Sequence, residues 1–141
     1  MNLKKYLLAT LAVYVLYSGL AIVIHEIILK ADYEPMIGSV TRPLSEFGQR
    51  APLLYLANLV FALAFCYIYV QGYEAEKSWL GQGLRFGLIA GTLLAPFAVT
   101  EWVIYPVPWL LCLKWIVFGY LQVLICGVAA AALYTAPPRR Y

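Results

Sequence analysis

Four long apolar runs constrain this chain more than any other feature of its sequence. They cover residues 6–29, 52–73, 83–105 and 108–134. Each reaches the ~20 residues that an α-helix needs to cross the ~30 Å hydrocarbon core of a bilayer. Transmembrane β-strands would instead alternate in polarity over ~10 residues, and these runs do not alternate. The sequence therefore predicts an all-α integral membrane bundle of four transmembrane helices, formed by a single domain over residues 1–141.

The composition supports a membrane protein and excludes a nucleic-acid-binding one. Apolar types make up 64% of the chain and charged types only 12%, against about 25% charged residues in soluble domains. The net charge is only +3, and the basic residues lie at the ends of the runs rather than in the clustered patch that nucleic acid requires. The three cysteines lie inside apolar runs without CxxC spacing, so we predict neither disulfides nor a zinc site.

The connections between the runs differ in length. Residues 30–51 form the one long connection, residues 74–82 form a short polar one, and residues 105–108 form a tight turn that makes the last two helices an antiparallel hairpin. Lys and Arg near helix ends favour the cytoplasmic side. The side of the N-terminus holds Lys4, Lys5, Lys77, Arg85, Arg139 and Arg140, against Lys30, Arg42 and Arg50 on the other side. We therefore expect both termini in the cytoplasm and the long connection outside.

A ridge of small residues opens the third run. Gly83, Gly87 and Gly91 recur every four residues, and such faces let two helix backbones approach closely in lipid. The sequence is compatible with two uses of this ridge. It packs against another helix of the same bundle, or it forms the interface with a second copy or with another membrane protein.

Four ionisable residues from three runs are expected at a similar depth, near the outer end of the bundle. His25 and Glu26 lie near the end of the first run, Glu101 lies one turn before the tight turn, and Lys114 lies about 9 Å after it. A lone charge at such a depth costs at least ~2.5 kcal/mol, so we expect Glu101 to pair with Lys114 across the hairpin and His25 to meet that pair. The cluster is either a binding site for a headgroup, proton or ion, or a structural ion pair that fixes the hairpin.

The other polar residues within the runs give weaker signals. His25 is the only histidine, and no CxxCH motif is present, so we expect no haem, no metal and no other cofactor. Asn58 and Gln122 lie near the middle of their runs, and we expect them to form hydrogen bonds between helices. The chain contains no GxSxG, HExxH, Walker or paired-aspartate motif, so we predict no catalytic residue.

Several stretches resemble a group of small, uncharacterised bacterial inner-membrane proteins. The stretches are His25 through Arg42-Pro43, then Tyr69-Val70-Gln71-Gly72-Tyr73-Glu74, then Gly83-Leu84-Arg85-Phe86-Gly87. The resemblance implies a bacterial source, the inner membrane and the same four-span plan. It implies no activity, catalytic residue or ligand.

The sequence alone favours a non-enzymatic role. We expect an accessory or structural subunit of a membrane complex, or a homo-oligomer, whose partners are the lipid bilayer and a membrane protein. The first alternative is a small transporter, or a binder of lipid or another hydrophobic ligand, that uses the outer cluster. The second alternative is an enzyme that modifies lipids or quinones with the same cluster as acid and base.

Overall fold

The computed structural model describes residues 1–135. Arg139 and Arg140, which enter the count that predicts the orientation, lie outside the described residues. Within residues 1–135, four helices are long and apolar enough to cross a membrane. The predicted all-α bundle of four transmembrane helices is confirmed, and the chain is a multi-pass membrane protein. Its orientation in the bilayer stays a prediction.

The helices follow one another with short connections, apart from the first. The spans are α1 (Leu3–Ile22), which continues as the π-helical turn η1 (Val23–Ile28), then α3 (Leu44–Gln71), α4 (Trp79–Ile104) and α5 (Trp109–Leu133). A short helix α2 (Lys30–Tyr33) and a 3-10 turn η2 (Glu34–Met36) lie between the first two spans. The connection between the first two spans is thus partly helical.

The second span begins well before its apolar run. α3 starts directly after Pro43, whereas the run starts at residue 52. Proline has the fixed φ that suits the start of a helix. Glu46 then pairs with Arg42 at 3.2 Å and with Arg50 at 3.0 Å, each four residues away. Such pairs stabilise a helix that extends into water, so the connection before α3 is shorter than predicted.

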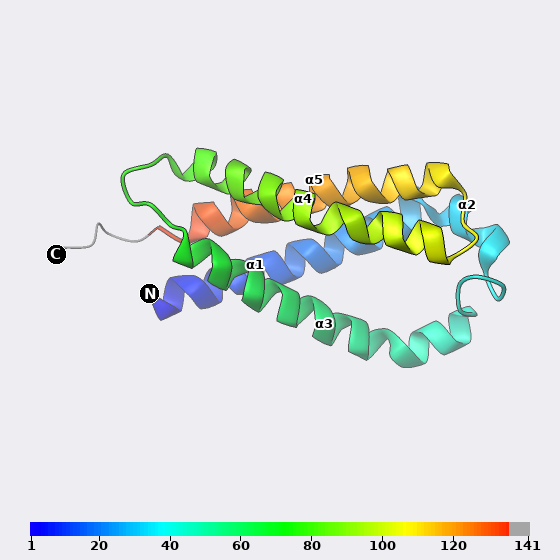
Figure 1. The fold of residues 1–141 in the computed structure, drawn as a ribbon. Coiled ribbons are helices and arrows are strands. Elements are labelled where there is room, and N and C mark those ends of the chain that lie inside the picture. The colour runs from blue at the N-terminus through cyan, green and yellow to red at the C-terminus, as the bar shows by residue number, and fades with distance from the viewer. Residues whose placement is uncertain (136–141) are drawn as a thin grey trace.

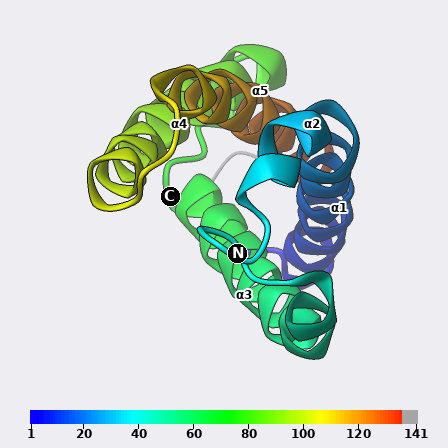
Figure 2. The ribbon, with the colours of Figure 1, turned by 90° about the vertical axis from the view of Figure 1, so that its right-hand side faces the viewer.

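The four spans lie in the order α3, α1, α5, α4, because α1 packs against both α3 and α5 while α4 packs against α5. Figure 2 shows this order as an open arc. We call the end of the molecule with α2 and the turn at residues 105–108 the loop end. The opposite, terminal end holds the N-terminus and the connection at residues 72–78 (Figure 1). The central pair of the arc is therefore α1 and α5.

The glycine ridge of α4 packs directly against α5. Gly83, Gly87 and Gly91 are all buried. A Cβ atom added to Gly87 would lie 2.7 Å from Cα of Leu124, and one added to Gly127 would lie 2.6 Å from the carbonyl oxygen of Gly83. The two backbones approach so closely that neither helix tolerates a side chain at these positions. The use of the ridge within the bundle is confirmed, and α5 occupies the face that a partner would need.

Interhelical hydrogen bonds join the central helices to their neighbours. Asn58 Nδ2 in α3 donates to Ser18 Oγ in α1 at 3.2 Å, and Gln122 Nε2 in α5 donates to the backbone carbonyl of Tyr17 at 2.7 Å. Both bonds confirm the role predicted for these two amides. They lie beside the main apolar core, which includes Ala9, Val13, Ala62, Phe65, Cys66, Val123, Cys126 and Ala130.

A single glutamine organises the connection at the terminal end. Gln82 Nε2 donates to the carbonyls of Glu74 and Lys77, both at 2.9 Å, and its Oε1 accepts from the amide of Glu74 at 2.8 Å. The Glu74 carboxylate also pairs with Lys77 at 2.7 Å and with Arg85 at 2.9 Å. Hydrogen bonds from Lys77 and then from Arg85 hold the pKa of Glu74 below its ordinary value.

Gly87→Ala is expected to destabilise the protein by about 1–3 kcal/mol, because the new methyl group would push α4 away from α5. Gly19→Ala is the matched control: Gly19 also lies in a spanning helix, but no atom of residues 1–135 approaches its Cβ position within 4 Å. Reversible unfolding in mixed detergent micelles measures both changes. Equal effects of the two substitutions would contradict the close packing of α4 on α5.

Glu74→Gln is expected to reduce the loss of stability on acidification. A carboxyl group whose pKa is lowered by folding stabilises the folded state above its ordinary pKa of 4.5, and this contribution disappears as the pH falls through the lower, folded value. Unfolding of both proteins should be measured from neutral to strongly acidic pH. The difference between them should shrink at acidic pH, and it should be small throughout because the ion pairs are exposed. A difference that does not change with pH would rule out this contribution.

Candidate functional site: a groove at the loop end

A second, smaller core anchors the connection between the first two spans. Leu29 and Leu111 are 0% and 1% exposed, and they pack with Ile24, Met36 and Val107. The π-helical turn η1 helps to place them, since the amide of Leu29 donates to the carbonyl of Ile24, five residues earlier, at 2.8 Å. Such wide turns often occur at functional sites. The connection is therefore packed against the loop ends of α1 and α5 rather than free in solvent.

This connection supplies the partner of Lys114. Nζ of Lys114 lies 2.8 Å from each carboxylate oxygen of Asp32, a residue of α2. The two side chains are only 34% and 29% exposed. A charged lysine within a spanning helix is costly without an opposite charge, and Asp32 provides that charge from outside the span.

The predicted ion pair between Glu101 and Lys114 is wrong. Glu101 is exposed on α4, and Lys114 pairs with Asp32 instead. The cause is the helical phase of α5. Cys112 faces α4, with its Sγ 3.5 Å from the carbonyl oxygen of Ala98, and Lys114 lies two residues, or about 200°, further round the helix. The hairpin brings α4 and α5 together, but the lysine lies on the opposite side of α5.

A hydrogen-bonded chain of three ring side chains lies next to the ion pair in the sequence and in space. Nε1 of Trp115 donates to Oη of Tyr33 at 2.5 Å, and the same Oη lies 2.7 Å from Nδ1 of His25. An indole nitrogen can only donate, so the Tyr33 oxygen accepts from Trp115, which leaves the tyrosine's own proton available for His25. We infer that neutral His25 accepts at Nδ1 and carries its proton on Nε2.

Tyr33 stays protonated in this environment. Burial raises the pKa of Tyr33 to about 12, with smaller contributions from the carboxylates of Asp32, Glu101 and Glu26 and an opposing one from the hydrogen bond of Trp115. A hydroxyl with this pKa remains a donor at any physiological pH.

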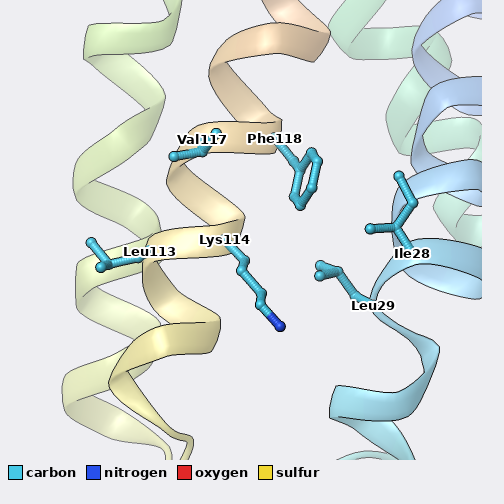
Figure 3. Close-up of a pocket in the computed structure, with 6 residues that line it drawn as sticks. All are labelled: Ile28, Leu29, Leu113, Lys114, Val117 and Phe118. Carbon is cyan, nitrogen blue, oxygen red and sulfur yellow. The ribbon is translucent and has the colours of Figure 1, made fainter.

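An open groove of about 300 Å³ lies between η1 and α5, beside Lys114 (Figure 3). Its volume is at the lower end of the ~300–1,000 Å³ typical of small-molecule sites. The Lys114 side chain extends away from Phe118 toward the loop end, and its ammonium group is the one charged group among the described residues of the lining. The apolar lining residues are Ile28, Leu29, Leu113, Val117 and Phe118. The groove thus combines a hydrocarbon surface with a charge at one end.

The structure brings the four predicted cluster residues to one end of the bundle but not into one contact. His25 contacts Tyr33, and Lys114 contacts Asp32. Glu26 and Glu101 are both exposed, and neither forms an ion pair with a described residue. The cluster is therefore divided into an ion pair, a hydrogen-bonded chain and two solvent- or lipid-facing carboxylates.

Sequence reasoning missed three residues of the site: Asp32, Tyr33 and Trp115. One signal was available. Lys114 required an acidic partner, and Asp32 belongs to the connection that the predicted topology places at the same end of the bundle. That connection also contains Glu34 and Glu46. The choice among the three carboxylates depends on how α2 packs on α5, which the apolar pattern does not reveal.

Comparisons with protein-family models, with curated proteins and with solved structures give no match. Among residues 1–135, no three His, Cys, Asp or Glu side chains gather where they could hold a metal ion. The groove, the ion pair and the hydrogen-bonded chain are therefore the features from which a function can be inferred.

Tyr33→Phe is expected to release His25 from a single tautomer, because Nδ1 loses its donor. Nitrogen NMR of the labelled histidine should show the Nε2–H form in the wild-type protein and a mixture of both forms in the variant. Tyr105→Phe is the matched control, since Tyr105 is an exposed tyrosine at the same end of the molecule. Observation of the Nδ1–H form in the wild-type protein would overturn the inferred direction of the chain.

Proposed function

We propose that this protein binds an amphipathic molecule of the membrane, with a hydrocarbon chain in the groove and a polar head at Lys114 and Asp32. The groove carries this proposal, because its apolar walls lead to a charged side chain. The ion pair adds a polar partner on the other side of that charge. The resemblance of the sequence to small bacterial inner-membrane proteins supports placing this protein in such a membrane.

The polarity of the groove runs in the same direction as that of a membrane lipid. Val117 and Phe118 follow Lys114 by about one turn of α5, or ~5.4 Å further from the loop end. A lipid in the adjacent leaflet has its chain toward the middle of the bilayer and its head toward the interface. Its chain would therefore meet the two apolar residues while its head meets the ion pair. This match holds whichever side of the membrane the loop end faces.

Our second proposal is a role as accessory subunit or homo-oligomer. The surface proposed to bind the partner is no longer the glycine ridge of α4. α5 covers the glycine ridge of α4, so the ridge no longer supports partner binding. The first half of α3 does support it. Every residue from 42 to 57 except Ala51 is exposed, so lipid or a partner must cover this segment within the membrane.

Val117→Trp is expected to reduce several-fold the amphiphile that co-purifies with the protein, because the indole would fill the groove. Val117 is 55% exposed, so a larger side chain fits there without disturbing the core. Mass spectrometry of the protein purified from native membranes in a gentle detergent measures both the retained small molecules and any protein partner.

Val103→Trp is the matched control for this experiment. Val103 is 71% exposed on α4 and does not line the groove. Equal retention of amphiphile by the wild-type protein and both variants would contradict binding in the groove. A stoichiometric protein partner without retained amphiphile would favour the second proposal instead.

A further inference from the structure

The two charged residues at the head end of the groove come from elements at different heights along the bundle. Lys114 lies five residues inside α5 from Trp109, which is about 7.5 Å from the start of the helix. Asp32 belongs to α2, which lies at the loop end of the molecule (Figure 1). From the middle of the bundle outward, the order is therefore the apolar lining of the groove, then the ammonium group of Lys114, then α2 with Asp32, which pairs with Lys114 and lies outside the groove lining.

We propose that the groove selects a zwitterionic phospholipid whose head carries a phosphate followed by an ammonium group, and this inference rests on the proposed function of the groove. In such a lipid the order from the middle of the bilayer outward is chain, phosphate and ammonium. Each charge of the head then meets its opposite: the phosphate lies at Lys114 and the ammonium lies at Asp32. The phosphate is the strongest acceptor in the head, and a lysine is a common point-charge partner for it.

The ion pair has unused hydrogen-bonding capacity on both sides. A lysine ammonium has three donors, and Asp32 is the one ion-pair or hydrogen-bond partner of Lys114 within the described residues. Each carboxylate oxygen of Asp32 accepts from Lys114 and has a further lone pair. Both side chains are about one-third exposed. A headgroup can therefore bind beside the pair without breaking it.

The wider environment of the head end disfavours a purely anionic lipid. The carboxylates of Asp32, Glu101 and Glu26 all lie near enough to act on the charge state of Tyr33, and they outnumber the two lysines of α2 and the groove lining, Lys30 and Lys114. A head with a net negative charge would meet this excess of carboxylates. A head that ends in an ammonium group would be attracted by them.

The test is a competition between two chain-matched lipids. The wild-type protein in detergent is mixed with equal amounts of oleoyl lysophosphatidylethanolamine and oleoyl lysophosphatidylglycerol, and native mass spectrometry counts the bound molecules. We expect a preference of about fivefold for the ethanolamine lipid, the size of effect that a partly exposed ion pair supplies. Equal binding of both lipids, reduced by Val117→Trp, would overturn headgroup selection and leave chain binding in place. Binding that Val117→Trp does not reduce would overturn the proposed function itself.

Two variants separate selection by the head from a purely structural role of the ion pair. The exchange Asp32→Lys with Lys114→Asp keeps an ion pair but reverses the order of its charges, so the preference for ethanolamine should disappear. Asp32→Asn removes only the outer carboxylate and should shift the preference toward the anionic lipid, and it covers the case in which the exchange variant does not fold. An unchanged preference in a folded variant would overturn the proposal.

Discussion

The structure depends on one constraint: hydrocarbon surrounds its helices, so the burial of apolar surface does not by itself hold two of them together. The contact between α4 and α5 meets this constraint by close approach, since Gly83, Gly87 and Gly127 leave no side chain between the backbones. The contacts of α1 add hydrogen bonds, from Asn58 in α3 and from Gln122 in α5. The first half of α3 has neither close backbone packing nor these hydrogen bonds to a described residue, and it is exposed on nearly every side.

The same constraint shapes the loop end. Lys114 lies on a face of α5 that α4 does not cover, so its charge must be neutralised by a segment outside the spans. α2 provides Asp32 for this purpose, and the small core around Leu29 and Leu111 holds the segment in place. α2 lies only at the end of α5, however, and beyond it Val117 is exposed while Phe118 is half-buried against the small core. The groove is thus the space between the Asp32–Lys114 ion pair and the apolar face of α5 that follows it.

The sequence was informative wherever a pattern repeats along one helix. The four spans followed from the length of the apolar runs, and the packing surface of α4 followed from the four-residue spacing of its glycines. The pairing of Lys114 could not be predicted in this way, because it depends on the phase of α5 relative to α4 and on the fold of a connection that lacks a periodic pattern. The early start of α3 was missed for a related reason, since the ion pairs of Glu46 extend a helix beyond its apolar run.

The structural and the binding roles of the Asp32–Lys114 pair support each other. An ion pair that is partly removed from water adds little net stability, although the loss of one partner leaves a costly lone charge. Its firmer consequence is positional: the contact with both carboxylate oxygens holds the ammonium group at the end of the groove. A charge that is already fixed in place does not have to be ordered when a ligand arrives, and this lowers the cost of binding. The requirement that a lysine be neutralised in the membrane therefore also creates a prepared site for a charged head.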